Sequence, residues 1–103
     1  MSRDYVLTAA AEADLRSLIR YTRSRWGDAQ TRKYVGALER GMRRLATGDG
    51  HFRMLGDIHD DLRAARCEHH FIFCLTRKNA PALIVAILHE QMDLMIRLNE
   101  RLR

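Results

Sequence analysis

The chain is poor in several residue types, and each shortage excludes a class of protein. Proline occurs once, at Pro81, so no proline-rich linker divides the 103 residues, and we expect a single domain spanning residues 1–103. No run of about 18 apolar residues is present, so we expect no membrane-spanning helix. Cys67 and Cys74 are too few and too close for a disulfide framework, which favours a reducing cytoplasm. Acidic residues follow Ala9–Ala11 at once, which is not typical of a signal peptide.

Lysine is almost absent, since only Lys33 and Lys78 occur among the 18 basic residues. Arginine therefore provides most of the positive charge behind a formal net charge of +5. The guanidinium group suits bidentate recognition of carboxylates and phosphates, so the composition favours an acidic protein or a nucleic acid as partner over a neutral small molecule. A solvated surface without any partner is the alternative that charge alone leaves open.

The first half of the chain predicts a short strand followed by two helices. Residues 5–7 form the strand, and Thr8 caps a helix of about 17 residues whose apolar side chains recur at helical spacing. Gly27-Asp28 both ends this helix and begins the next, so the two helices must fold back as a hairpin. The second helix ends near Gly48, and we expect Gly36 and Gly41 to let the two helices approach closely.

The second half predicts an antiparallel sheet with strands at residues 62–68, 70–76 and 82–88, after a turn-rich connection at residues 54–61. The last strand is apolar on both faces, with Leu83, Val85 and Ile87 alternating with Ile84, Ala86 and Leu88, so it lies centrally with both faces covered. The helical hairpin covers one face. A short final helix, capped by Asp93, is the candidate for the other; Leu94, Leu98 and Leu102 form its apolar stripe, and Arg97, Arg101 and Arg103 point elsewhere. The predicted fold class is therefore α+β, with a helical hairpin packed on an antiparallel sheet.

Two groups of residues resemble known kinds of chemical site. Cys67, His69, His70 and Cys74 are of the types that bind zinc, but strand alternation puts Cys67 and His69 on one face and His70 and Cys74 on the other, so we expect no metal and no cofactor. Arg63, Arg66, His70 and His89 could instead provide the base, cations and acid for metal-free RNA cleavage. The sequence has no glycine-rich phosphate loop, nucleophile elbow or paired carboxylates. Tyr21, Trp26 and Tyr34 are either contacts for a partner or core residues of the helices.

Five segments, taken in order, resemble the ParE branch of the RelE/ParE toxin superfamily. They are LTAAAEADL at residues 7–15, IRYT at residues 19–22 with Trp26-Gly27, Leu62-Arg63 with Arg66, HFIF at residues 70–73, and ILHEQMD at residues 87–93. The resemblance covers nearly the whole chain and implies the toxin of a type II toxin–antitoxin module.

This resemblance implies that the protein arrests growth by binding DNA gyrase rather than by catalysis. It also implies neutralisation by an acidic ParD-like antitoxin, which would make the only contact with DNA. The RelE branch instead cuts ribosome-bound mRNA and carries an arginine within a Tyr-Arg-Ile segment. Here the matching segment is His70-Phe71-Ile72, so Phe71 stands in place of that arginine, which counts against ribonuclease activity. A RelE-like mRNA endonuclease remains the alternative, and a non-toxic structural subunit is a third interpretation.

Two sets of candidate binding residues follow. The antitoxin is expected to lie across the hairpin and sheet and to contact Arg63, Arg66 and His70. The C-terminal segment is expected to contact the target through His89, Asp93, Leu94, Arg97, Leu98 and Arg101. The alternative for the leucines in this segment is that they only close the hydrophobic core.

Overall fold

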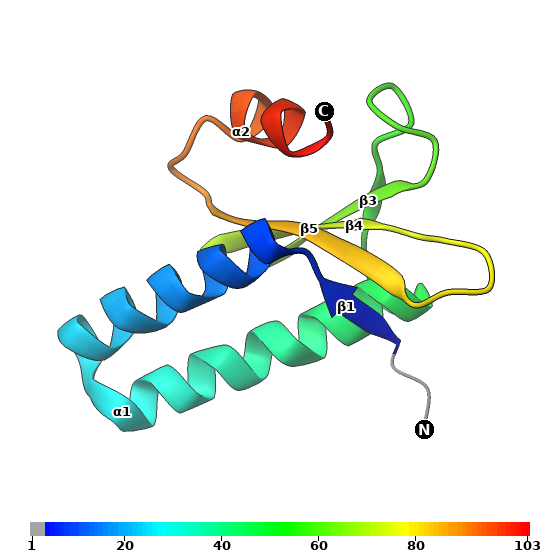
Figure 1. Ribbon diagram of the computed structural model, residues 1–103. Helices are drawn as coiled ribbons and strands as arrows, with labels where there is room; N and C mark the ends of the chain where they lie inside the picture. Colours follow the sequence, from blue (N-terminus) through cyan, green and yellow to red (C-terminus); the bar gives the residue numbers. More distant parts are fainter. Residues whose placement is uncertain (1–3) are drawn as a thin grey trace.

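The first layer of the molecule is a helical hairpin. The structure, a computed structural model, describes residues 4–103; after the short strand β1 (Tyr5–Leu7), helix α1 (Ala9–Thr47) folds back on itself (Figure 1). The bend is at Gly27, whose φ of 83° and ψ of 176° are not helical, so α1 consists of a first arm (residues 9–26) and a second arm (residues 28–47). Thr8 accepts a hydrogen bond from the Ala11 amide at 3.0 Å, and Gly48 ends the second arm in a left-handed conformation. The predicted hairpin and its boundaries are confirmed.

The second layer is a five-stranded sheet with the order β1-β5-β4-β3-β2. Its remaining strands are β2 (Arg53–Met54), β3 (Leu62–Cys67), β4 (His70–Leu75) and β5 (Ala82–His89). Three strand pairs are antiparallel, as predicted for the second half of the chain, whereas β1 runs parallel to β5, a pairing that was not predicted, so the sheet as a whole is mixed. The two-residue strand β2 was not predicted, and it overlaps the first residue, Met54, of the predicted turn-rich connection at residues 54–61.

Strand β5 lies centrally, as predicted, but its two faces are not the predicted ones. Phe73 pairs with Ala86 and Cys74 pairs with Ile84, which leaves Val85 as an extra residue in a β-bulge. Val85 and Ala86 both belong to the cluster on the α2 side, while Ile84 and Ile87 face the hairpin. A bulge exchanges the faces of every residue beyond it, so simple alternation assigned Ala86, Ile87 and Leu88 to the wrong sets.

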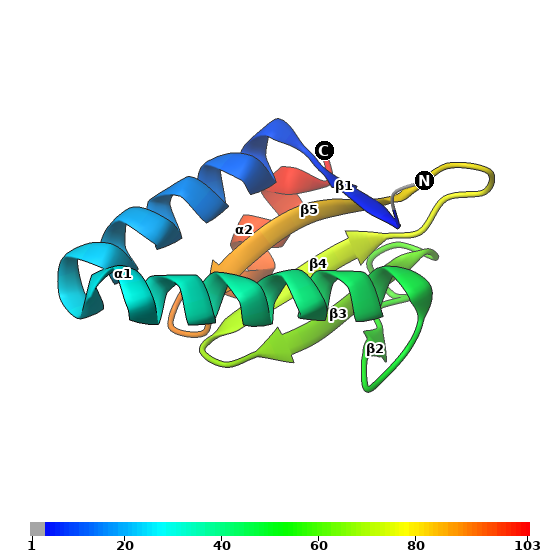
Figure 2. The same cartoon turned by 90° about the horizontal axis from the view of Figure 1, so that it is seen from below.

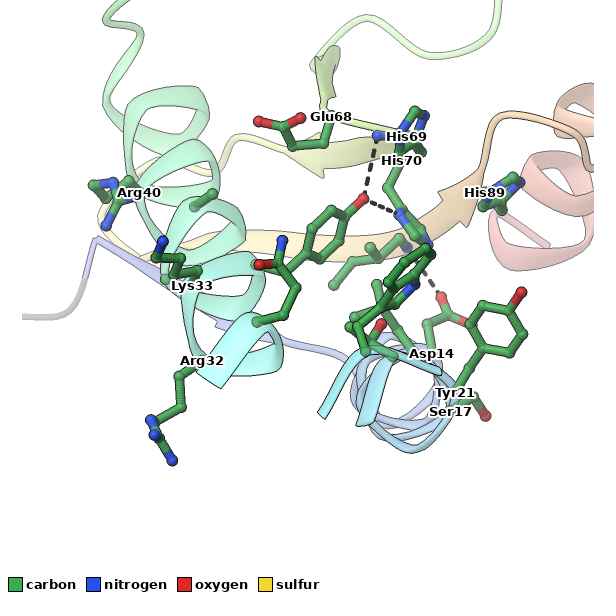
Figure 3. Close-up of a pocket in the computed structure, with 18 of the residues that line it drawn as sticks. Asp14, Ser17, Tyr21, Arg32, Lys33, Arg40, Glu68, His69, His70 and His89 are labelled. Atoms are coloured by element: carbon green, nitrogen blue, oxygen red, sulfur yellow. Dashed lines mark hydrogen bonds between the residues drawn. The ribbon is translucent and has the colours of Figure 1, made fainter. Parts of the chain in front are cut away.

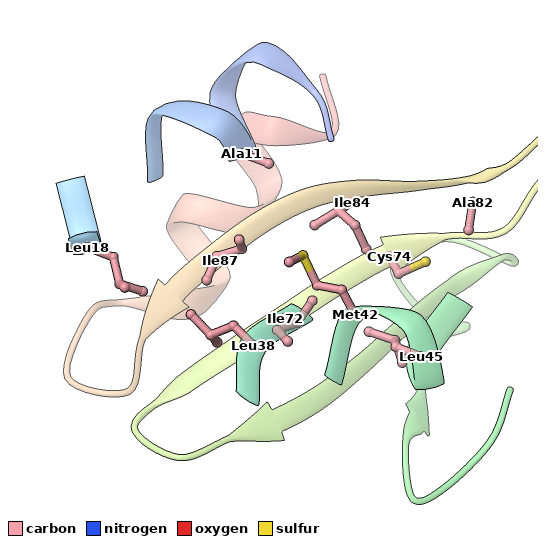
Figure 4. Close-up of a cluster of buried hydrophobic side chains, with 10 residues drawn as sticks. All are labelled: Ala11, Leu18, Leu38, Met42, Leu45, Ile72, Cys74, Ala82, Ile84 and Ile87. Carbon is pink, nitrogen blue, oxygen red and sulfur yellow. The ribbon is translucent and has the colours of Figure 1, made fainter. Parts of the chain in front are cut away.

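Two hydrophobic clusters hold the layers together, one on each face of the sheet. The cluster between hairpin and sheet contains Leu18, Leu38, Met42 and Ile72 with six other buried residues (Figure 4). A Cβ atom on Gly41 would lie 3.3 Å from the Ile72 side chain, so this glycine brings the second arm close to the sheet rather than to the first arm. Gly36 faces only the flexible end of Arg40, so the expectation that both glycines bring the helices together is wrong.

Helix α2 (Leu94–Arg101) covers the other face of the sheet (Figures 1 and 2). Asp93 caps it by accepting a hydrogen bond from the Ile96 amide at 3.3 Å, as predicted. Leu98 is fully buried in the second cluster, together with Phe73, Val85 and Leu88. The final helix is therefore part of the domain's own core. Within residues 4–103, no helix is both long and apolar enough to span a membrane.

Candidate functional site

A large cleft lies between the two arms of α1 and one end of the sheet (Figure 3). Its volume is about 1300 Å³. The first arm, the second arm, the β3–β4 turn and the end of β5 all contribute to its lining. Its lining includes Asp14, Leu18, Tyr21, Trp26, Arg32, Lys33, Tyr34, Arg40, His69, His70, Ile87, His89 and Met92. This volume exceeds the roughly 300 to 1,000 Å³ that is typical of small-molecule pockets.

A hydrogen-bonded group formed by Tyr34 and His70 lies inside this cleft. The Tyr34 hydroxyl accepts a hydrogen bond from the His69 backbone amide at 3.2 Å and lies 2.6 Å from His70 Nδ1 (Figure 3). Since the phenol oxygen already accepts from an amide, its own proton is available for Nδ1, which places the proton of a neutral His70 on Nε2. Burial raises the pKa of Tyr34, which keeps this hydroxyl protonated.

His70 is the first residue of β4 and pairs with His89, the last residue of β5. The two rings meet edge to face with centroids 5.2 Å apart. Burial is the main cause that lowers the pKa of His70 to about 4, and the charges of His89 and His69 lower it further against the opposing effect of Glu90 and Asp14. His70 is therefore neutral at pH 7 and acts as a positioned hydrogen-bonding group rather than as a cation.

Arg66 lies at the same end of the sheet as His70, but on its other face. Its guanidinium group is 5.7 Å from the centroid of the Phe71 ring and forms an ion pair with Glu90. Glu90 also lies 3.4 Å from His69 Nδ1. The Arg66 side chain is 59% exposed, so it remains accessible to a partner. Phe71 packs with the α2-side cluster and not in the cleft.

Arg63 does not join Arg66 and His70. It donates a hydrogen bond to the Leu45 carbonyl at 2.9 Å, and its guanidinium group lies 4.7 Å from the centroid of the Phe52 ring. It therefore satisfies a carbonyl of the last turn of the second arm, away from the cleft. The helix end therefore already uses part of this side chain, and contact of Arg63 with an antitoxin carboxylate stays a prediction.

Two of the residues expected to contact a target are also used within the domain. Leu98 is fully buried, and Arg101 forms a bidentate ion pair with Asp14, with N–O distances of 2.7 and 2.8 Å. Arg101 also donates to the Val85 carbonyl at 3.0 Å, and Asp14 accepts from the Ile87 amide at 3.0 Å. The expected outward orientation of Leu98 and Arg101 is wrong, because the leucine closes the core and the arginine neutralises a partly buried carboxylate.

The remaining C-terminal candidates are more accessible. His89 lines the cleft and accepts a hydrogen bond from the Gln91 amide at Nδ1, while Leu94 is partly buried. Arg97 is exposed beside Met95 and Ile96, which are 51% and 57% exposed. These two residues were not predicted, because the leucines alone were expected to form the apolar side of the helix. In the structure, α2 also presents Met95 and Ile96 on its exposed side.

The structure also corrects the argument about metal ligands. Cys67, His70 and Cys74 all lie on the hairpin side of the sheet, where Cys67 Sγ is 3.5 Å from the Ala37 carbonyl oxygen. The assumed alternation failed because the two-residue turn between β3 and β4 puts Cys67 and His70 opposite each other in register. Burial raises the pKa of the Cys74 thiol to about 11. Across residues 4–103, no three His, Cys, Asp or Glu side chains are grouped to hold a metal ion.

A hairpin packed on a mixed sheet, with a cleft that contains neutral hydrogen-bonding groups and basic side chains along its lining, defines a small α+β protein with a hydrophobic core cluster on each face of the sheet. Comparison with known proteins identifies the kind. Residues 5–94 match the family model described as the ParE toxin of the type II toxin–antitoxin system parDE, and the chain belongs to this family.

Individual relatives agree with this assignment. Toxin ParE of Escherichia coli is 60% identical over 99 residues, which cover 96% of each chain. Toxin ParE1 of Mycobacterium tuberculosis is 29% identical over 90% of this chain and 95% of its own length. Among solved structures, one titled as a chromosomal ParDE toxin–antitoxin system from P. aeruginosa has the same fold, with a TM-score of 0.66 at 19% identity over 86% of this chain and 95% of the other. The predicted family and fold class are confirmed.

Proposed function

We propose that this toxin arrests growth in the cytoplasm by binding DNA gyrase, without catalysing a reaction. The observation that supports a non-catalytic role is the arrangement of the cleft: His70 is neutral and its Nδ1 already accepts a hydrogen bond from the Tyr34 hydroxyl, while Arg32, Lys33 and Arg40 come from the second arm. RNA cleavage needs a base and an acid held near cations that stabilise the phosphorane. Phe71, which stands where RelE-type toxins have an arginine, packs away from this cleft.

The test is a supercoiling assay with purified DNA gyrase and purified toxin. The proposal expects inhibition by the toxin and its reversal by the cognate antitoxin. Undisturbed supercoiling at a large molar excess of folded toxin would contradict gyrase as the target. Cleavage of mRNA on programmed ribosomes, lost in a His89→Ala variant, would replace the proposal by the RelE-like nuclease.

The toxin's partner in the module is an acidic ParD-like antitoxin, which occupies the cleft. The support is the combination of a formal net charge of +5, the basic side chains of Arg32, Lys33 and Arg40 that line the cleft, and the Nε2 proton of His70. The accessible guanidinium group of Arg66 lies outside the cleft, at the same end of the sheet, where an acidic segment would reach it on leaving the cleft. Carboxylates and carbonyl groups of an acidic segment match these donors. An Arg66→Ala substitution should weaken antitoxin binding by about 2 to 5 kcal/mol, mainly through faster dissociation. An Arg53→Ala variant at the far edge of the sheet is the matched control; equal affinity of both variants would remove Arg66 from the interface.

The target contact from the C-terminal segment involves its outward residues. His89 and Asp93 fix where the segment leaves the sheet, while Leu94, Arg97, Met95 and Ile96 form the accessible surface. Removing the whole segment would expose the sheet beneath Leu98, so point variants are the better test. Ile96→Ser should reduce gyrase inhibition and leave the melting temperature unchanged. Full inhibition by an Ile96→Ser, Arg97→Ala double variant would exclude this surface.

A further inference from the structure

Two large aromatic side chains are exposed at the end of the first arm, just before the bend at Gly27. Tyr21 is 62% exposed and Trp26 is 64% exposed, and neither belongs to either hydrophobic cluster. The backbone bend that presents them depends on a positive φ at Gly27 and not on packing of the rings. The fold therefore gains little from these rings, although their exposure is a liability for a small monomer.

Arg25 lies between the two rings. Its guanidinium carbon is 6.0 Å from the Tyr21 centroid and 5.9 Å from the Trp26 centroid. We call these three residues, Tyr21, Arg25 and Trp26, the hairpin tip. Tryptophan, tyrosine and arginine are the residue types that contribute most to binding at protein interfaces, and here all three are accessible in one cluster.

Most of the charged side chains near the hairpin tip are basic. Residues 20–33 contain five basic side chains and one acidic side chain, Asp28, which is already paired with Arg23 at 3.0 Å. A second copy of this chain would bring like charges together, whereas an acidic protein surface would be attracted. A single-stranded nucleic acid would also use aromatic rings beside basic groups. Tyr21 and Trp26, however, open onto a cleft whose lining includes the apolar side chains of Leu18 and Ile87, which match an apolar segment of a protein better than a phosphate backbone.

We propose that the hairpin tip binds an acidic surface of the target protein and that the antitoxin neutralises the toxin by covering the same two rings. Tyr21 and Trp26 line the cleft that we assign to the antitoxin, and Met92, at the start of the C-terminal segment, lines it as well. The target surface thus lies on both sides of the cleft, with the tip on one side and the C-terminal segment on the other. This inference rests on the proposed function, in that it assumes a toxin that acts by binding a protein.

The test compares growth arrest, target binding and antitoxin binding for Trp26→Ala and for an Arg25→Ala, Trp26→Ala double variant. Truncation of an interface residue of this kind weakens binding by about 30-fold or more. We expect that loss for target binding, together with loss of growth arrest on induced expression, at an unchanged melting temperature. Met54→Ala is the matched control, because it removes another exposed apolar side chain, in the edge strand β2. This variant should remain toxic. Trp26→Phe keeps a ring and should retain most of the activity.

The outcomes separate this inference from the proposed function. Growth arrest can be measured without knowing the target, so the variants test the hairpin tip in either case. A wild-type toxin that arrests growth but fails to bind gyrase contradicts only the gyrase proposal. A folded Trp26→Ala variant with full toxicity overturns the role of the tip. Simultaneous binding of target and antitoxin to one toxin molecule overturns the neutralisation mechanism. Loss of binding to a short DNA duplex by the double variant, with target binding intact, assigns the tip to nucleic acid and also overturns the proposal.

Discussion

At the scale of single residues, the ion pair between Asp14 and Arg101 joins three elements that are far apart in the chain. Arg101 of α2 contacts Asp14 of the first arm and the Val85 carbonyl in the bulge of β5. The two side chains are only 14% and 23% exposed, so removal of one partner leaves a poorly solvated charge. Arg101→Met should lower the free energy of unfolding by about 2 to 3 kcal/mol, measured by urea denaturation at pH 7.

Arg97→Met is the matched control for this prediction, because it removes the same charge from an exposed position on the same helix. It should change stability by less than about 0.5 kcal/mol. Equal stability of the two variants would show that the Asp14–Arg101 pair does not stabilise the fold.

His70 makes the stability of the protein depend on pH. Burial and the neighbouring histidines lower its pKa in the folded state to about 4, whereas an unfolded chain has the ordinary value near 6.5. Between these values the unfolded state binds more protons, so stability is fully present above about pH 6.5 and is lost as the pH falls toward 4. The expected loss from this group is about 2 to 3 kcal/mol. Urea titrations between pH 7.5 and 4 measure it.

The matched variants for this pH dependence are His70→Asn and His51→Asn. The asparagine side-chain oxygen can accept a hydrogen bond from the Tyr34 hydroxyl near the position of Nδ1, but asparagine does not titrate. His70→Asn should therefore flatten the pH dependence of the free energy of unfolding. His51 is exposed, and its substitution should leave the wild-type profile intact. A pH profile that survives in His70→Asn would assign the effect to other groups.

Which arginines face a partner could not be predicted from the sequence. Arg63 and Arg101 were both expected at an interface because guanidinium groups suit carboxylates, yet each is used internally, by a helix end and by Asp14. Strand alternation and helical spacing give the face on which a residue lies, but not the segment that packs against that face. His70 and His89, in contrast, were predictable, since both lie at strand ends beside a turn, and the structure brings them together in the cleft.

At the scale of elements, the bend in α1 depends on one glycine. Gly27 has a φ of 83° and a ψ of 176°, a region that other residues occupy only at a cost of about 1 to 3 kcal/mol. A Cβ atom at Gly27 would meet nothing within 4 Å, so strain is the only penalty of a Gly27→Ala substitution. We expect thermal or urea unfolding to show that loss, with a disturbed hairpin tip and weaker target binding.

Gly36→Ala is the contrasting substitution within the same helix. Gly36 has an ordinary helical conformation, and an added Cβ would meet only the mobile end of Arg40, at 3.3 Å. Alanine should therefore stabilise the second arm by about 0.5 to 1 kcal/mol. Destabilisation of both variants by the same amount would contradict the argument from backbone conformation.

The elements themselves were predictable, whereas their pairing was not. Thr8, Gly27, Gly48 and Asp93 are local signals, and they mark the helix boundaries that the structure has. The parallel contact of β1 with β5 joins segments almost 80 residues apart, and no local pattern encodes it. The bulge at Val85 is also non-local, because it exists only relative to β4 and is held by Arg101 from α2.

At the scale of the whole molecule, the two helical layers leave one end of the sheet accessible between the arms of α1. The hairpin covers one face and α2 covers the other, so both apolar faces of β5 are satisfied without a partner. The toxin therefore needs no antitoxin to complete its core. Its binding groups lie instead at the cleft and at its rim, where basic side chains of the second arm meet the histidines of the sheet.

This charge distribution predicts how the antitoxin associates. A net charge of +5 attracts an acidic chain, and salt screens this attraction. The association rate constant should therefore fall about tenfold or more between 50 and 500 mM NaCl, while the dissociation rate constant changes little.

Arg40→Gln at the cleft and Arg53→Gln on β2 remove the same charge from different places. Stopped-flow measurements at low salt should show slower association for Arg40→Gln than for Arg53→Gln, because the field that guides the acidic segment is strongest near the cleft. Equal rates for the two variants would mean that only net charge matters, and a rate that does not respond to salt would exclude electrostatic attraction of the antitoxin altogether.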